Sequence, residues 1–136
     1  MHGRRLLGVA LAATTVIGCG GGEGSDAPTA DAPVIATFEV VDEAYRILLT
    51  DPGDIAVARQ LLSGAEAPSI PNGLVLRGDS GVNDGYTWSI DPDDVEFADS
   101  TIEVCDGLPS DVGAGVITSD RYCPWSATLV ELEPAP

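Results

Sequence analysis

Alternating apolar and polar residues predict an antiparallel hairpin over residues 34–49. In segments 34–41 and 45–49, apolar side chains recur at every second position, which is the period of a strand with one buried face. Asp42 and Glu43 interrupt the pattern between the two segments. Two alternating segments separated by a short polar interruption are typical of a strand hairpin.

A helix is predicted directly after this hairpin. Asp51 is placed to cap the first helical turn, and Pro52 suits the first helical position, where a backbone amide would have no partner. Gly64 favours the end of the helix. The apolar side of the predicted helix consists of Ile55, Ala58, Leu61 and Leu62.

The rest of the chain alternates in short segments separated by turn residues. Pro68 together with residues 71–73 (Pro-Asn-Gly) predicts a turn-rich connection, and the pair Asp91 and Pro92 predicts a turn. Short strands are expected at residues 74–76, 86–90, 101–105 and 123–132. The last of these is apolar on both faces, so we expect both faces to be covered. One helix and roughly five to seven short strands predict a small, mostly antiparallel α+β domain with one disulfide.

Two cysteines stand at the ends of a loop rich in Gly, Ser and Asp. Cys105 closes one expected strand and Cys123 opens the next. A disulfide between them would join the two strands and close a loop over residues 106–122. In the chain-entropy account, closing a loop of that length stabilises the folded state by about 3 kcal/mol. The sequence therefore predicts a Cys105–Cys123 disulfide.

Both tryptophans lie in alternating segments. Trp88 and Trp125 each fall on the apolar side of an expected strand, which predicts that they fill the core. The alternative is that they are exposed anchors for a partner, because aromatic residues are enriched at the centres of interfaces.

The first residues have the pattern of an export signal. Arg4 and Arg5 provide a charged start, and an apolar run follows from Leu6 to Ile17. This run is shorter than the about 20 residues of a membrane-spanning helix. Residues 16–19 (Val-Ile-Gly-Cys) resemble the lipobox of bacterial lipoproteins, in which a peptidase cuts before an acylated cysteine. The alternative is an ordinary secreted protein with Cys19 as a spare thiol.

The lipobox resemblance divides the chain into three parts. These are a signal peptide at residues 1–18, a flexible acidic Gly/Ala/Pro tether at 19–33 and a single globular domain at 34–136. The two or three acyl chains implied at Cys19 would hold the protein stably on a membrane. Gly20, in place of Asp directly after the cysteine, favours the outer membrane. The expected location is the cell envelope, at the outer membrane or the cell surface.

The charge of the chain excludes some partners. The formal net charge is −16, no lysine is present, and the only basic residues after the signal are Arg46, Arg59, Arg77 and Arg121. Such a surface repels phosphate backbones, so nucleic acid is not an expected partner. Anionic lipid headgroups are repelled as well, which leaves the acyl group on Cys19 as the expected membrane contact.

The residue types also restrict catalysis. His2 is the only histidine and lies within the signal, so neither a Ser–His–Asp device nor a histidine-based zinc site is expected. Acid–base chemistry with two carboxylates remains possible. The clustered candidates are Asp91, Asp93, Asp94 and Glu96. A domain of this size has little room for a substrate cleft, so we expect neither an enzyme nor a cofactor.

Calcium is the metal that the oxygen-rich loops would favour. The two groups of candidate ligands are Asp79, Asn83 and Asp84, and Asp91, Asp93 and Asp94. The first group does not fit the EF-hand pattern, because Asp84 occupies the position of its invariant glycine. Turn capping explains the same residues. No metal site is therefore predicted, and a calcium-dependent adhesion module stays as an alternative.

Several short motifs are similar to those of one known family. They comprise Thr50 to Pro52, Ala58 with Arg59, Leu62 to Gly64, Trp88 with Asp91 and Pro92, Ile102 to Gly107, and Arg121 with Cys123 to Ser126. Spanning about residues 36–132, they resemble the N-terminal domain of the slime-mould calmodulin-binding protein family, which also occurs in bacterial secreted proteins. The family pattern usually has a histidine where this chain has Ser89. The resemblance implies a disulfide-closed extracellular module.

The family name does not make calmodulin an expected partner. Calmodulin recognises basic amphipathic helices, whereas the one predicted helix carries a single arginine, Arg59. We instead expect a membrane-anchored extracytoplasmic lipoprotein whose small domain binds an extracellular protein or a small ligand. A carboxylate-based hydrolase is the other alternative.

The candidate binding surface consists of Asp91, Asp93 and Arg121. Arg121 lies close to Cys123 in an acidic chain, so we expect it to pair with an Asp or Glu; a ligand carboxylate is the alternative partner.

Overall fold

The predicted hairpin begins the fold. The computed structural model of the protein describes residues 32–101 and 104–136. Strands β1 (Val34–Val40) and β2 (Glu43–Leu49) pair antiparallel, with Val34 opposite Leu49 and Val40 opposite Glu43. Strand β6 (Thr128–Pro134) pairs antiparallel with the other side of β1. This first sheet, sheet A, has the strand order β2-β1-β6.

The middle of the chain builds a second three-stranded sheet, sheet B. Its strands are β3 (Ile70–Arg77), β4 (Trp88–Ala98) and β5 (Arg121–Tyr122), in the order β4-β3-β5. Both pairings in sheet B are antiparallel. The prediction of a small, mostly antiparallel α+β fold is confirmed.

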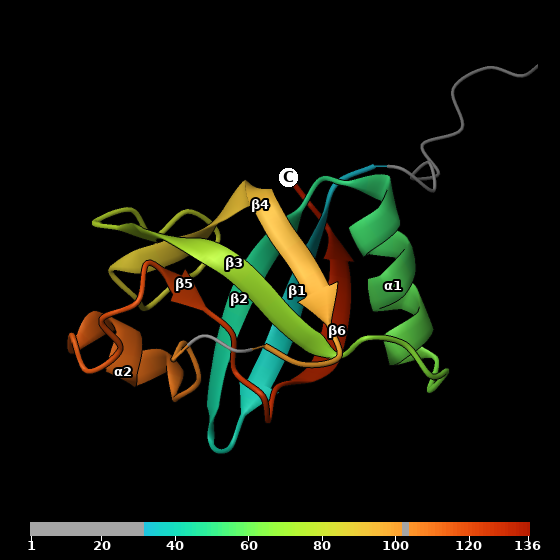
Figure 1. The fold of residues 1–136 in the computed structure, drawn as a ribbon. Coiled ribbons are helices and arrows are strands. Elements are labelled where there is room, and N and C mark those ends of the chain that lie inside the picture. Colours follow the sequence, from blue (N-terminus) through green and yellow to red (C-terminus); the bar gives the residue numbers. More distant parts are fainter. Residues whose placement is uncertain (1–31, 102–103) are drawn as a thin grey trace, which may run out of the picture.

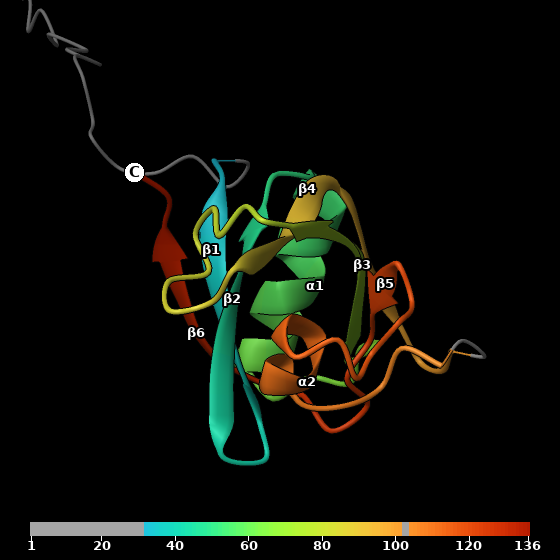
Figure 2. The ribbon, with the colours of Figure 1, turned by 90° about the vertical axis from the view of Figure 1, so that its left-hand side faces the viewer.

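Two helices lie between the sheets. Helix α1 (Pro52–Leu62) contacts β6 and β4, and helix α2 (Pro109–Gly113) contacts β2. In Figure 2, α2 lies toward the viewer and α1 lies behind it, with sheet A on one side and sheet B on the other. Each helix therefore covers one open end of the two-sheet core (Figure 1). No helix in the described ranges is long and apolar enough to cross a membrane.

Aromatic rings fill the space between the two sheets. Every aromatic residue except Trp125 belongs to one network of ring contacts, which joins Phe38, Tyr45, Tyr86, Trp88, Phe97 and Tyr122. Trp88 is 1% exposed, and its ring centroid lies 5.9 Å from that of Tyr45 and 5.5 Å from that of Tyr122. The predicted core position of Trp88 is confirmed.

Helix α1 begins and ends as the sequence predicts. The Asp51 carboxylate accepts hydrogen bonds from the first backbone amides of the helix, at 2.8 and 3.2 Å. Gly64 follows the last turn with a φ of 83°, a conformation that favours glycine. The fully buried residues of the helix are Ile55 and Ala58. Leu62, predicted on the same side, is the last helical residue and is 46% exposed, so the apolar stripe stops short of the helix end.

The turn predicted at residues 71–73 is wrong, because these residues lie inside β3. Strand β5 pairs only with Gly73 and Leu74, so Pro71 has no β5 residue opposite it, and its missing amide hydrogen is tolerated. A Cβ at Gly73 would lie 2.2 Å from the Ile90 side chain, so the two strands can approach this closely only at a glycine.

The turn predicted at Asp91 and Pro92 is also wrong, because β4 continues through both residues. The pairing jumps from Val75 opposite Ile90 to Gly73 opposite Val95. The extra residues on β4 form a bulge, which bends a strand without ending it.

The strands predicted beside the cysteines are shorter than expected. Within 101–105, Ile102 and Glu103 lie outside the described residues, and the rest are not in a strand. A backbone hydrogen bond of 2.9 Å from Cys123 to Cys105 holds this segment in place of a strand ladder. Within 123–132, strand pairing begins only at Thr128, and β6 is an edge strand of sheet A. Its two faces are not both covered, because Val130 is 41% exposed.

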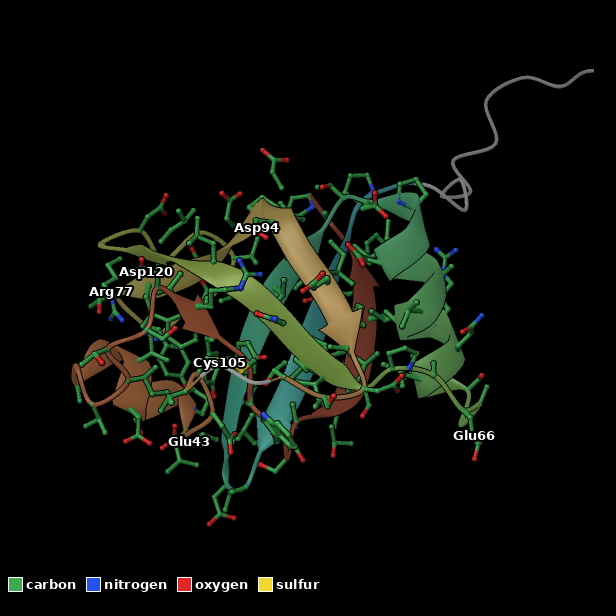
Figure 3. All side chains as sticks on the ribbon, in the orientation of Figure 1. Glu43, Glu66, Arg77, Asp94, Cys105 and Asp120 are labelled. Atoms are coloured by element: carbon green, nitrogen blue, oxygen red, sulfur yellow. A yellow bond between two sulfur atoms is a disulfide. The ribbon has the colours of Figure 1, made fainter. Side chains whose placement is uncertain are left out.

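Helix α2 is not predicted by the sequence pattern, because five residues are too short to show a helical period. The Glu43 carboxylate caps it by accepting hydrogen bonds from the Ser110 amide at 2.8 Å and from the Ser110 hydroxyl at 2.6 Å. The Arg77 guanidinium donates to three backbone carbonyls, those of Val112, Ile117 and Ser119. Figure 3 shows Glu43 and Arg77 on the side of the molecule where α2 lies. Contacts distant in sequence thus hold this segment.

The β1–β2 turn yields a stability prediction. Val41 is the only non-glycine with a positive φ among the described residues, at 59°, and its side chain is 69% exposed. A left-handed conformation is unfavourable for a β-branched residue. Replacing Val41 with Gly should therefore raise the free energy of unfolding by about 0.5 to 1 kcal/mol, as measured by urea unfolding.

Val116 offers a matched control for this turn. It is also 69% exposed, and it is not among the residues with positive φ. Val116→Gly should not stabilise the protein, because glycine there only increases the freedom of the unfolded chain. Equal effects of the two substitutions would show that Val41 is not strained.

Candidate functional site

The predicted disulfide is present. Cys105 and Cys123 are bridged, their Cα atoms are 5.1 Å apart, and both residues are fully buried. Ile70, at the start of β3, packs with them in a small apolar cluster. The bridge therefore attaches the segment before α2 to the residue that directly follows β5. Cys19, the predicted lipidation site, lies outside the described residues.

Trp125 lies next to the disulfide and is 49% exposed, so the prediction that it fills the core is wrong. The reason is that it occupies a turn after Pro124, where its side chain has no sheet to pack against. Its indole nitrogen donates to the Thr101 hydroxyl at 2.9 Å, and its backbone amide donates to the Asp106 carboxylate at 2.9 Å. Trp125 thus joins the two segments that flank the disulfide.

Arg121 pairs with a carboxylate of the chain, as predicted. Its guanidinium donates to both carboxylate oxygens of Asp94, at 2.9 and 3.2 Å. Its Nε donates to the side-chain oxygen of the buried Asn72 at 2.9 Å, and the Asn72 amide in turn donates to Glu96 at 3.4 Å. Figure 3 shows Asp94 on β4. This two-point contact fixes Arg121 on strand β5 against β4.

Asp93 lies in a different environment from its neighbour Asp94. It lines a cleft of about 320 Å³ at the N-terminal end of α1, together with the carboxylates of Asp51 and Asp54. Burial raises the pKa of Asp54, and the nearby charges of Asp51 and Glu96 raise it further. The cleft therefore gathers negative charge at a helix start that favours anions.

Two motifs that carry the family resemblance meet at this cleft. The Thr50 hydroxyl donates to the Pro92 carbonyl at 3.3 Å, which connects the segment before α1 to the bulge in β4. The Asp91 carboxylate accepts a hydrogen bond from the Asp93 amide at 2.9 Å and so fixes the bulge itself. Of the candidate surface residues, Asp91 and Asp93 therefore lie at this bulge, whereas Arg121 is held by Asp94 on sheet B.

The candidate calcium ligands after β3 have contacts that explain them as loop residues. Asp79 accepts from the Gly81 amide at 2.9 Å. Asn83 is fully buried, accepts from the Arg46 amide at 3.0 Å and donates to the Trp88 carbonyl at 3.0 Å. Asp84 lies 3.8 Å from the Arg46 guanidinium. Within the described ranges, no group of three or more His, Cys, Asp or Glu residues could hold a metal ion.

The loop over Asn83 also protects the free edge of β2. Because β1 pairs on one side of β2 only, the other side would expose unpaired backbone groups. Asn83 bonds the Arg46 amide there, and the Tyr86 hydroxyl donates to the Ala44 carbonyl at 2.8 Å. The loop thus takes the place of a neighbouring strand.

Buried tyrosines predict a loss of stability at alkaline pH. Burial raises the pKa of Tyr45 well above its usual 10.0, and burial followed by the charge of Asp106 raises the pKa of Tyr122. The folded state therefore holds these protons to higher pH than the unfolded chain does. The resulting stabilisation is complete below the unfolded pKa and is lost as the pH rises toward the folded pKa.

Urea unfolding at about pH 8 and about pH 11 checks this expectation. The midpoint should fall at the higher pH, and tyrosinate absorbance should appear together with unfolding. An unchanged midpoint, with tyrosinate formed in the folded state, would contradict the assignment.

The two facing sheets, the aromatic core and the bridge at Cys105 and Cys123 define a small disulfide-closed α+β domain. The model of one protein family, described as the BP-74 N-terminal domain, matches residues 32–136. The chain therefore belongs to this family, which confirms the resemblance to the N-terminal domain of the slime-mould calmodulin-binding protein family. No curated protein and no solved structure matches the chain.

Proposed function

We propose that the protein is a lipid-anchored protein of the cell envelope whose single globular domain binds a ligand outside the cytosol. The observation that carries this proposal is the buried disulfide between Cys105 and Cys123. Such bridges form and persist in oxidising compartments and are rare in the cytosol. The charged and apolar start of the chain supports export by an independent pattern.

The proposed anchor is an acylated Cys19, held away from the domain by the tether at residues 19–33. The described part of the chain starts beside its C-terminal end, because the Ala135 amide donates to the Pro33 carbonyl at 3.1 Å. Gly20 after the cysteine favours the outer membrane or the cell surface as the location.

A binding role is favoured over catalysis because the carboxylates predicted to act together, those of Asp91, Asp93 and Asp94, do not converge on one point. Asp91 fixes a bulge, Asp93 faces the α1 cleft, and Asp94 is held by Arg121. A hydrolase with two carboxylates needs both groups on one substrate bond. The acidic surface makes nucleic acid a poor partner, and Arg59 alone gives α1 no basic face for calmodulin.

Labelling with radioactive palmitate in the native cell tests the anchor. The wild-type chain should incorporate label and sediment with membranes, and Cys19→Ser should do neither. The matched control is the double variant Cys105→Ser with Cys123→Ser, which removes two other cysteines and should keep its label. A wild-type chain without label would contradict the proposed anchor.

A further inference from the structure

A cavity of about 220 Å³ lies between β2 and the β3–β4 hairpin. Its walls are mostly apolar and include Leu48 from β2, Leu76 from β3, Ile90 from β4 and Val82 from the loop after β3. A cavity of about 150 Å³ with aliphatic walls is large enough to hold benzene in another protein. This cavity therefore has room for a molecule with a small ring or a short chain.

One polar side chain reaches the cavity from inside the fold. Ser89 is 6% exposed and lines the cavity from β4. Its hydroxyl makes no hydrogen bond to another residue in the part of the chain that the structure describes. Among the described residues, two buried side-chain atoms have neither solvent contact nor a hydrogen-bond partner, Thr37 Oγ1 and Trp88 Nε1. The Ser89 hydroxyl is not one of them, so it is not closed off from the cavity. A buried hydroxyl that is left free beside a cavity is suited to bind a ligand.

The loop after β3 is shaped to leave space over this hydroxyl. Gly81 has a φ of 48°, and a Cβ there would lie 3.3 Å from Ser89 Oγ. Any larger residue at position 81 would therefore crowd Ser89. The Asp79 carboxylate fixes this part of the loop by accepting the Gly81 amide at 2.9 Å.

The charges around the cavity favour an uncharged ligand. Arg46 and Asp79 both line it and have opposite signs. The Arg46 guanidinium also has two carboxylates at 3.7 and 3.8 Å, those of Glu133 and Asp84. A charged group placed against Ser89 would lose its hydration and gain only a neutral hydroxyl in exchange. The site therefore offers one hydrogen bond and apolar contacts.

We propose that this cavity binds a small uncharged organic molecule with an aliphatic ring or short chain and one hydroxyl or carbonyl oxygen, which exchanges a hydrogen bond with Ser89. The proposal deepens the binding role given above and rests on it. It does not depend on the lipid anchor, because the cavity lies wholly within the described domain. Palmitate labelling and ligand titration can therefore fail separately.

Titration with cyclohexanol, followed by the amide NMR spectrum, tests the proposal. The protein is the chain from Gly20 onward, joined behind an unrelated cleavable export signal so that it is secreted and the disulfide forms. Saturable shifts are expected at Gly81, Ser89 and Ile90. Ser89→Ala should weaken binding about fivefold, which is the contribution of one neutral hydrogen bond. The matched control Ser126→Ala alters an exposed serine and should leave the affinity unchanged.

Ser89→Ala should remain folded, since it removes a hydroxyl without a partner from a buried position, and its melting temperature verifies this. Cyclohexanecarboxylate and cyclohexylammonium test the sign of the charge, and both should bind more weakly than cyclohexanol. The proposal is overturned if cyclohexanol gives no saturable shifts, if Ser89→Ala binds as tightly as the wild type, or if either ion binds more tightly.

Discussion

Trp88→Ala is expected to lower the free energy of unfolding by about 3 to 5 kcal/mol, which is a large share of the stability of a small domain. Trp88 is 1% exposed, and its ring contacts Tyr45, Tyr86 and Tyr122 between the two sheets. Truncation leaves a cavity that α2 and sheet A cannot close without losing their own contacts. Urea unfolding followed by far-UV circular dichroism measures the effect.

Trp125→Ala is the matched control, because it removes the same side chain from a position that is 49% exposed. Trp125→Ala should lower the free energy of unfolding much less than Trp88→Ala does. The main contribution is the lost hydrogen bond to Thr101, which is worth about 1 kcal/mol. Comparable losses for the two variants would mean that the core is not centred on Trp88.

Removing the disulfide, by Cys105→Ala together with Cys123→Ala, should lower the free energy of unfolding by about 3 kcal/mol. The two cysteines are separated by 18 positions in the sequence, and the loop between them contains α2. Hydrogen bonds with Arg77 and Glu43, which are distant in the sequence, hold α2 in place. Without the bridge, the unfolded chain gains the freedom of that loop. Because both cysteines are fully buried, alanine replaces them without exposing a polar group.

Reductant provides an internal comparison for the bridge. The wild-type protein in reductant should approach the urea midpoint of the double variant, and the double variant should not respond to reductant. If the double variant unfolds at the same urea concentration as the oxidised wild type, the bridge does not stabilise the domain.

The elements that local chemistry determines could be predicted from the sequence. The Asp51 cap and Gly64 mark both ends of α1, and the β1–β2 alternation fixes a hairpin. Elements that depend on distant contacts could not. Helix α2 needs the Glu43 carboxylate, and β4 passes through Pro92 only because a bulge forms opposite Leu74 of β3.

The same division holds for the candidate sites. The disulfide and the pairing of Arg121 with an acid follow from residue types that have few other partners, and both were predictable. The cavity was not, because its walls come from β2, β3, β4 and the loop after β3, which no local pattern connects. The only signal in the sequence is Ser89, at a position where the family pattern usually has a histidine.

The intact mass of the protein, extracted from its native membrane without reductant, tests the proposed lipid-anchored, disulfide-closed module most directly. The proposal predicts a chain that begins at Cys19, carries the added mass of acyl groups and lacks the thiol hydrogens of Cys105 and Cys123. A chain that keeps the signal, or one in which all three cysteines are free thiols, would contradict it.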